Sequence, residues 1–498
     1  MKSKKEQIEQ YHQADIIEDL PDEVSEQPRL QEISDIEIPE ALKDPVEYNE
    51  LKHRIFEKRP FWQKIPEFSK VAEEEFLTME FQNKNTATKV DHLDELLEGL
   101  VSEEFLGDVR QGMHLAPMNL RLSPYILSLI NWDDPYNDPL RTQFIPVAST
   151  RRPDHPKLSL DSLSEQEDSP TPGLVHRYFD KVLFLALDVC PVYCRFCTRS
   201  YAIGSDTDLV TKLSFKPVPR KWNEAFAYIA SRPEVEDVVI SGGDSYMLKA
   251  HRITQIGKTL LDIPHVRRIR FASKGPSVMP MKIVSDDGWS EALIEVVKHG
   301  QKKGKEVALH THFNHSNEIT YVTKQAMDKL FTNGVRVRNQ SVLIRGVNDS
   351  MEDMVNLVRQ LAYINVQPYY VYQHDMVKGT EELRTALKDS IELERNVRGT
   401  TAGFNTPTFV MDAPGGGGKR DLHSYEYYDE ETGVSVYRSP AVDEKKIYLY
   451  FDPIDSLPKS GQVRWKIPRE GDKIIEEAIK KSGHSDCRSR NQPNSSRY

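Results

Sequence analysis

The chain has 498 residues, of which 38% are hydrophobic and 29% charged, a composition typical of a soluble protein with enough apolar material for a large core. The 66 basic and 77 acidic side chains give a net charge of −11, which argues against nucleic acid as the main partner, because phosphate binding needs a concentrated basic surface. Residues 1–50 hold most of this charge, with 15 acidic and 5 basic side chains. No secretory signal and no apolar run of about 18 residues is visible, so we expect a cytoplasmic protein that does not enter a membrane.

The N-terminal third predicts an extension followed by a helical region. Residues 1–45 are acidic with few aromatic side chains, and we expect a partly disordered extension that is mobile or loosely docked. Residues 46–172 read as a helical region and a linker, and the stretch Pro153–Pro172, rich in Ser, Pro and acidic residues, predicts that linker or surface wrap. Two sets of apolar residues are spaced for one helix face each: Phe61, Trp62, Ile65 and Phe68, then Leu93, Leu96, Leu97 and Leu100.

After Gly173 short apolar runs alternate with helical patterns, which predicts repeated βα units and a parallel sheet. The predicted strands are Val182–Leu187, Asp237–Ser241, Arg267–Phe271, Val307–His310, Val335–Val342, Gln367–Tyr372 and Thr406–Met411, and the predicted helices include Trp222–Ala230, Ser290–Lys298, Lys324–Asn333 and Met351–Ile364. We therefore expect an α/β fold: a partial (βα)6-type parallel barrel over residues 173–419, with the active site at the carboxyl ends of its strands. A small α+β extension over 420–481 and a disordered tail over 482–498 complete the prediction.

Three of the four cysteines lie within eight residues, in Cys190-Pro-Val-Tyr-Cys194-Arg-Phe-Cys197, directly after a predicted strand. Such crowding indicates a metal or cluster site in a reducing compartment. Three thiolates on one loop can bind three irons of a [4Fe–4S] cluster and leave the fourth iron open to a small molecule. The alternatives are a zinc loop, although no second cysteine pair is present to complete four ligands, and three buried cysteines without metal. Cys487 lies in a polar tail and is a poor fourth ligand.

A glycine run, Gly415 to Gly418, ends at Lys419 and follows the apolar strand candidate that ends at Asp412. Four glycines cost backbone entropy, so the run indicates close approach to a ligand or exact placement of one side chain. Lys419 could form a Schiff base with an aldehyde cofactor such as pyridoxal 5′-phosphate, which needs a neutral amine that desolvation favours. A phosphate-binding loop is a poor alternative, since Arg420 stands where Ser or Thr is required. The remaining alternative is a flexible linker.

The CxxxCxxC loop after a first barrel strand resembles the radical S-adenosylmethionine superfamily. In that superfamily the open iron binds S-adenosylmethionine, and reduction of the cluster yields a 5′-deoxyadenosyl radical. The turn Gly242-Gly243-Asp244, after the second parallel strand, fits the superfamily's methionine-binding turn, because glycines let backbone groups approach a ligand.

Taken together, the cysteine loop and the glycine run resemble the lysine 2,3-aminomutase family, whose members use pyridoxal phosphate and S-adenosylmethionine. The resemblance covers roughly Pro172 to Lys419, and these segments support it: His176–Lys181, Tyr193–Arg199, Thr311–His315, Asn339–Asp349, Pro368–Tyr370 and Asp412–Lys419.

The resemblance implies a role for each matching residue. Cys190, Cys194 and Cys197 would bind the cluster; Lys419 would bind pyridoxal phosphate, with Arg177 and Lys181 at its phosphate; Gly242, Gly243, Asp244, His312 and Gln340 would line the S-adenosylmethionine pocket; Arg199 would bind the substrate carboxylate; and Asp375 and Asp412 would hold the distal ammonium of lysine. Two carboxylates in a closed pocket repel each other unless a cation lies between them, which favours a substrate with a positive side chain.

The chain departs from the family pattern at three positions. Ser350 replaces a zinc-binding cysteine, and no cysteine cluster follows Lys419, so we expect no zinc and a different or weaker subunit contact. Lys181 replaces an arginine, which keeps the charge but loses the two-pronged fork. Lys274 also stands where the family has an arginine, which affects the details of S-adenosylmethionine binding.

The resemblance implies an isomerase that converts L-lysine to β-lysine by 1,2-amino migration, initiated by the 5′-deoxyadenosyl radical. It also implies an electron-donating protein of the flavodoxin or ferredoxin type, with a homo-oligomer as a further possibility. One alternative is a mutase for another cationic amino acid, such as arginine or ornithine, or a supplier of β-lysine for modifying a protein. The other is a cluster-bearing sensor or scaffold that has lost catalysis.

Overall fold

A computed structural model describes residues 51–213, 219–285 and 288–484, and every structural statement below concerns these residues. The chain divides into two units, Met1–Leu51 and Lys52–Tyr498, and the fold described here is that of the second. The predicted mobility of residues 1–45 and the predicted disorder beyond residue 484 lie outside the described residues.

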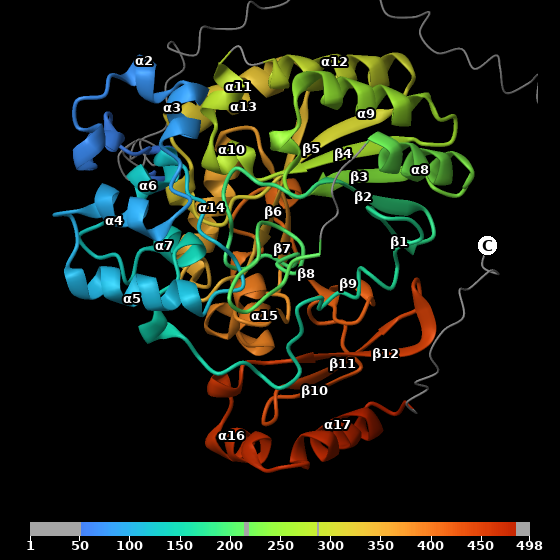
Figure 1. The fold of residues 1–498 in the computed structure, drawn as a ribbon. Coiled ribbons are helices and arrows are strands. Elements are labelled where there is room, and N and C mark those ends of the chain that lie inside the picture. Colours follow the sequence, from blue (N-terminus) through green and yellow to red (C-terminus); the bar gives the residue numbers. More distant parts are fainter. Residues whose placement is uncertain (1–50, 214–218, 286–287, 485–498) are drawn as a thin grey trace, which may run out of the picture. The chain divides into compact units, whose positions relative to one another are not determined.

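Within the described residues, nine strands form one sheet in chain order (Figure 1). They are β1 (Leu174–Tyr178), β2 (Lys181–Leu187), β3 (Asp237–Gly242), β4 (Arg268–Ser273), β5 (Glu306–Thr311), β6 (Arg336–Val342), β7 (Gln367–Tyr372), β8 (Thr408–Ala413) and β9 (Gly418–Asp421). Strands β2 to β8 pair in parallel, each with the next, and the antiparallel strands β1 and β9 flank the two edges. The sheet is nearly closed, so the predicted parallel barrel is confirmed.

The two edge strands of the barrel meet through one side chain. Tyr178 ends β1, and its hydroxyl accepts a hydrogen bond from the backbone N–H of Lys419 in β9 at 2.9 Å. A Cβ added to Gly418 would lie 2.3 Å from the same hydroxyl oxygen, and Gly418 has a φ of +71°, which L-residues with a side chain rarely adopt. Only glycine therefore allows β9 to approach β1 at the point where Lys419 enters the barrel.

Helices connect successive parallel strands on the outside of the barrel (Figure 1). They are α8 (Pro219–Ala230), α9 (Ala250–Asp262), the short α10 (Gly275–Val278) and α11 (Met281–Val284), α12 (Trp289–Lys302), α13 (Tyr321–Thr332), α14 (Met351–Tyr363) and α15 (Leu387–Val397). The predicted helices agree with these to within a few residues. In α14 the hydroxyl of Ser350 caps the first turn by accepting from the N–H of Asp353, which explains why the helix begins at Met351.

The N-terminal region is helical, as predicted, but its first apolar set does not form one helix face. Its helices are α2 (Glu73–Phe76), α3 (Met79–Lys84), α4 (Val90–Leu97), α5 (Glu103–His114), α6 (Pro124–Leu129) and α7 (Pro139–Phe144). Phe61, Trp62, Ile65 and Phe68 are all buried, yet they lie on two short 3₁₀ helices, Phe61–Lys64 and Pro66–Phe68. Pro66 ends the first turn because a residue before proline avoids the helical region. In the second set, Leu100 lies beyond the end of α4.

The stretch Pro153–Pro172 has no helix or strand, as a linker would, but it is not merely a surface wrap. Leu158, Leu163 and Glu165 are buried, and the N–H of Gly415 donates to the carbonyl of Ser162 at 2.8 Å. The prediction of a linker therefore missed that this stretch packs against the barrel and the glycine run.

The C-terminal extension forms a separate antiparallel sheet that packs on the barrel (Figure 1). It contains β10 (Tyr427–Asp429), β11 (Val434–Ser439) and β12 (Asp443–Phe451), followed by α16 (Lys459–Lys466) and α17 (Glu470–Lys481). Its apolar side chains share one core with those of β7 and β8. Tyr448 of β12 backs the glycine run, since a Cβ on Gly417 would lie 2.6 Å from its ring. The predicted α+β extension is confirmed, and it supports the glycine run from behind.

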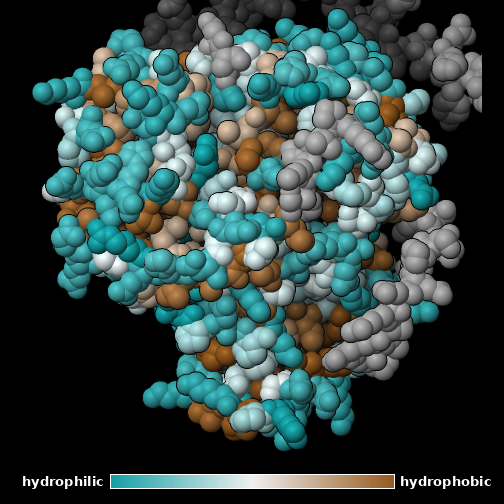
Figure 2. All heavy atoms as spheres, viewed as in Figure 1, coloured by the Kyte–Doolittle hydropathy of each residue, from teal (hydrophilic) through white to brown (hydrophobic). Residues whose placement is uncertain are grey.

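Hydrophilic side chains cover most of the face drawn in Figure 2, with hydrophobic side chains in scattered patches. Among the described helices, none is long and apolar enough to cross a membrane.

Candidate active site

One cavity of about 500 Å³ lies inside the barrel. Every site residue predicted from the sequence lines it: Arg177, Lys181, Cys190, Cys194, Cys197, Arg199, Gly242, Gly243, Asp244, His312, Gln340, Asp375, Asp412 and Lys419. The three thiols and the lysine of the glycine run therefore line the same cavity. The roles assigned to these residues stay predictions.

The cysteine loop follows β2 and is anchored by the side chain that points out of it. Arg195 is buried, donates to the carbonyl of Thr142 at 2.9 Å, and forms an ion pair with Glu382. On the inner side, the ring of Phe196 stacks on His312, with ring centres 5.5 Å apart. Because these contacts fix the residues between the cysteines, the loop presents its three thiols to the cavity.

The three thiols are free, and burial raises the pKa of each, that of Cys194 to about 12. Among the described residues, no group of three or more His, Cys, Asp or Glu side chains converges on a point where one metal ion could bind. A [4Fe–4S] cluster takes one thiolate per iron, so the three cysteine sulfurs need not converge on one point to bind it. The donors are all thiols, lie on one loop and line one cavity, and this set fits a cluster better than a single zinc ion.

The glycine pair after β3 approaches the cysteine loop. A Cβ on Gly242 would lie 2.1 Å from the carbonyl oxygen of Leu187, and one on Gly243 would lie 2.2 Å from that of Val189. The N–H groups of Gly243 and Asp244 donate to these same two carbonyls, at 2.6 and 2.9 Å. We predicted glycines for close approach to a ligand, whereas the observed close approach is to the backbone that leads into Cys190.

Several buried polar atoms along the cavity have no hydrogen-bond partner among the described residues. They are His310 Nε2, Thr311 Oγ1, His312 Nε2 and Asp375 Oδ1. Burial lowers the pKa of His310 to about 3 and that of His312 well below its ordinary value, so both rings are neutral at physiological pH. Gln340 contacts the other ring nitrogen of His310 at 3.1 Å. Unpartnered polar atoms are costly unless a ligand satisfies them, so this wall fits a polar ligand such as S-adenosylmethionine.

Lys419 and Asp412 face each other across a hairpin. They are register partners in the antiparallel pair of β8 and β9, with the glycine run as the turn, and Lys419 Nζ lies 3.2 Å from Asp412 Oδ2. We expected desolvation to favour the neutral amine. Although burial does act in that direction, the charge of Asp412, together with Tyr372 and Tyr178, raises the pKa of Lys419 above its ordinary value. The amine of Lys419 is therefore charged beside Asp412.

Asp375 follows β7, and its buried Oδ1 has no hydrogen-bond partner among the described residues. Burial, followed by the nearby charge of Asp412, raises the pKa of Asp375 well above its ordinary value. A cation placed between Asp375 and Asp412 would relieve both effects.

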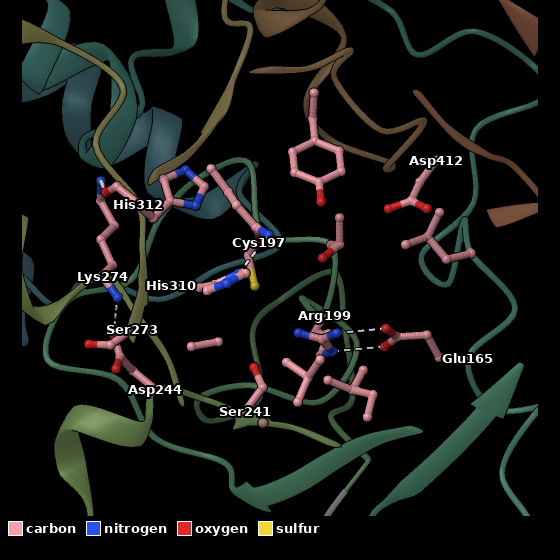
Figure 3. A pocket seen from close by; sticks show the side chains of 18 of the residues that line it. Glu165, Cys197, Arg199, Ser241, Asp244, Ser273, Lys274, His310, His312 and Asp412 are labelled. Atoms are coloured by element: carbon pink, nitrogen blue, oxygen red, sulfur yellow. Dashed lines mark hydrogen bonds and ion pairs between the residues drawn. The ribbon is translucent and has the colours of Figure 1, made fainter. Parts of the chain in front are cut away.

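The two arginines are each held by an acidic residue from the stretch Pro153–Pro172. Arg199 forms a two-pronged pair with Glu165 at 2.7 and 2.8 Å (Figure 3), and Arg177 Nε donates to Asp168 at 2.7 Å. Lys181 lies over the ring of Tyr178 at 4.0 Å, and burial lowers its pKa.

Sequence reasoning missed Glu165 and Asp168, because their stretch has no periodicity; its only signal was the number of acidic residues before a site rich in bases. It also missed the partner of Lys274. Lys274 Nζ donates to Glu318 at 3.0 Å and to the carbonyl of His312 at 2.9 Å. The lysine that replaces the family arginine is thus a buried structural contact beside His312.

The fold and the cavity define a parallel-barrel enzyme whose site combines a triple-cysteine loop with a lysine on a glycine run. A family described as lysine-2,3-aminomutase (LAM_C) matches residues 393–428. The chain belongs to the lysine 2,3-aminomutase family, as its similarity to the relatives below shows.

Three relatives illustrate that similarity. An L-lysine 2,3-aminomutase of Fusobacterium nucleatum is 40% identical over 352 residues, which cover 71% of this chain and 77% of the relative. An L-lysine 2,3-aminomutase of Clostridium subterminale is 38% identical over 393 residues, 78% of this chain and 88% of the relative. A glutamate 2,3-aminomutase of Clostridioides difficile is 32% identical over 397 residues, 77% of this chain and 88% of the relative.

Proposed function

We propose that the chain is an isomerase that converts L-lysine to β-lysine by moving the α-amino group to the neighbouring carbon. The observation that supports this most strongly is the single cavity that contains both the cysteine loop and Lys419. The similarity to L-lysine 2,3-aminomutases over more than two thirds of the chain supports the same activity.

We infer that Cys190, Cys194 and Cys197 hold a [4Fe–4S] cluster, that the wall with His312 and Gln340 holds S-adenosylmethionine, and that Lys419 holds pyridoxal phosphate, with Arg177 and Lys181 at its phosphate. When bound, these groups supply the radical that removes hydrogen from the substrate and the carbonyl carbon that carries the amine during migration. Electrons for the cluster would come from a separate reductant protein of the flavodoxin or ferredoxin type.

The protein's own contribution is to bind and orient the amino acid. Arg199 provides a planar, two-pronged donor for the substrate carboxylate. Asp375 and Asp412 would hold the side-chain ammonium at the other end, so the two ends of lysine fix its Cα and Cβ between them. The amine of Lys419 is protonated beside Asp412 and must lose that proton to bind an aldehyde.

The pair of aspartates favours lysine over glutamate. A glutamate side chain would bring another negative charge toward Asp412 and would supply no cation to the buried oxygen of Asp375, which has no partner among the described residues. A lysine ammonium supplies the missing cation and the missing hydrogen bonds. The same argument admits arginine or ornithine, so substrate length must be tested directly.

The test is anaerobic reconstitution of the full chain with iron and sulfide, followed by incubation with pyridoxal phosphate, S-adenosylmethionine and a reductant. Lysine, ornithine, arginine and glutamate are offered separately, and the products are analysed. We expect β-lysine from lysine and no product from glutamate. Turnover of ornithine or arginine without turnover of lysine would overturn the substrate assignment, and no turnover of any of them would favour a scaffold that has lost catalysis.

A further inference from the structure

The residues Asp161–Asp168, named here the acidic strap, contact both predicted anion-binding arginines and the glycine run that carries Lys419. Glu165 binds Arg199, Asp168 binds Arg177, and the carbonyl of Ser162 accepts from the glycine run at Gly415. One short segment, remote in sequence from the glycine run, thus contacts both arginines and the backbone of the glycine run that precedes Lys419.

The strap is itself held in a defined turn. Asp161 accepts hydrogen bonds from the N–H groups of Glu165 and Gln166, at 3.0 and 3.1 Å. Ser164 in the turn has a φ of +53°, a conformation that is uncommon for residues other than glycine. Because the turn fixes the backbone, the carboxylate of Glu165 is placed by the chain and does not sample many positions.

Glu165 occupies only one edge of the Arg199 guanidinium. Its two oxygens accept from Nε and Nη2, and these are the only hydrogen bonds of the Arg199 side chain to described residues. Glu165 is 6% exposed and also accepts from the hydroxyl of Tyr201 at 3.1 Å. The Nη1 group remains available, so a second carboxylate can bind the opposite edge of a guanidinium whose plane Glu165 has already fixed (Figure 3).

In Arg177 the strap also occupies the Nε and Nη2 edge of the guanidinium. Its Nε donates to Asp168, and its Nη2 donates to the carbonyl of Leu163, so the strap takes the Nε and Nη2 side and leaves Nη1 without a partner among the described residues. Asp168 raises the pKa of Arg177 despite burial, and Glu165 does the same for Arg199. Both arginines are thus kept charged and oriented before any anion binds.

We propose that the acidic strap positions both anion-binding arginines: Glu165 orients Arg199 for the substrate carboxylate, and Asp168 orients Arg177 for the cofactor phosphate. This inference rests on the proposed function. The competing explanation is that each carboxylate is a placeholder that the anion must displace. The two differ in sign, because loss of a positioning group weakens anion binding, whereas loss of a placeholder strengthens it.

The experiment compares Glu165→Gln, Asp168→Asn and the control Glu167→Gln in the full chain. Glu167 lies between the two strap acids in sequence, and its side chain is exposed. Pyridoxal phosphate affinity is measured by absorbance titration of the protein without substrate. The lysine KM and kcat are measured in the reconstituted enzyme at saturating cofactor.

We expect E165Q to raise the lysine KM about tenfold while kcat and cofactor affinity change by less than about threefold, since it removes one charge-assisted contact. D168N should weaken cofactor binding about tenfold and leave the lysine KM close to that of the wild type at saturating cofactor. E167Q should match the wild type in both measurements. Tyr201→Phe should raise the lysine KM by a smaller factor than E165Q.

A fall in lysine KM in E165Q, or tighter cofactor binding in D168N, would overturn the positioning role in favour of the placeholder. A joint loss of both affinities in each variant would overturn it in favour of a merely structural strap. The cofactor titration does not require turnover, so a wild type inactive on lysine would refute the proposed function while D168N still tests the strap.

Discussion

The ion pair between Lys419 and Asp412 allows a prediction about how the amine of Lys419 becomes reactive. Nζ and Oδ2 are 3.2 Å apart, and Coulomb's law with an effective dielectric constant of about 20 gives roughly 5 kcal/mol for such a pair. The Lys419 side chain is 35% exposed, so solvent screening reduces this to about 1.5–3 kcal/mol. At 1.36 kcal/mol per pH unit, Asp412→Asn should lower the pKa of Lys419 by about one to two units.

The sign follows from the charge that is removed. Asp412 stabilises the protonated amine, so its loss favours the neutral amine, and burial of Lys419 then acts unopposed by that carboxylate. Because only the neutral amine attacks an aldehyde, the rate of pyridoxal phosphate capture at pH 7 should rise about 10- to 100-fold in D412N.

The assay is stopped-flow absorbance of the protein-bound imine after mixing protein without cofactor with pyridoxal phosphate, over a range of pH. The midpoint of the rate profile should move to lower pH in D412N. Asp421→Asn, an exposed aspartate on the same strand as Lys419, is the matched control and should leave the profile unchanged. A D412N midpoint equal to or higher than that of the wild type would refute the argument.

Three further predictions concern other parts of the cavity. Gly418→Ala adds a methyl group 2.3 Å from the hydroxyl of Tyr178 and should weaken pyridoxal phosphate binding, measured by absorbance titration, at least about tenfold. Gly415→Ala meets no atom within 4 Å, so it should lose only about 1–2 kcal/mol of stability, measured by urea denaturation, for its left-handed backbone. Because burial raises the pKa of Asp375, lysine binding should release a proton there, so lysine affinity should increase with pH until Asp375 is ionised in the protein without lysine. Calorimetry should show this pH dependence reduced in Asp375→Asn, and an unchanged pH dependence in that variant would contradict the prediction. Cys197→Ala should lose iron and the visible cluster absorbance on reconstitution while Cys487→Ala retains both, and an equal loss in the two variants would mean that Cys487 is a ligand.

The sequence was sufficient for the barrel, and its resemblance to a known family identified many of the residues that line the cavity, although it missed Glu165. The strands of the barrel are short apolar runs between helical patterns, so periodicity located them. Polar residues such as Asp375 and Asp412 stand near the ends of these strands, so the same pattern located them as well. The cysteine loop and the glycine run were recognisable because their spacing is local. The hairpin that pairs Asp412 with Lys419 was not predicted, because no strand was expected directly after the glycine run.

What could not be predicted depends on contacts between segments distant in sequence. Glu165 lies 34 residues before Arg199, in a stretch with no periodicity, and its orientation depends on a turn that Asp161 caps. The two short 3₁₀ helices that bury Phe61 and Phe68 also lack a helical repeat of useful length. The charged state of Lys419 could not be predicted without the distance between its amine and Asp412, because burial and Asp412 act on its pKa in opposite directions.

The central claim is that one cavity lets a single lysine molecule contact both the group held by Lys419 and the group held at the cysteine loop. The most direct test offers lysine with deuterium at Cβ to the reconstituted enzyme and follows the label by mass spectrometry. If the proposed function is right, deuterium appears both in β-lysine and in the nucleoside part of S-adenosylmethionine, because the hydrogen that leaves Cβ returns from that nucleoside. Formation of β-lysine with no deuterium in the nucleoside would contradict contact of one lysine with both groups in this cavity.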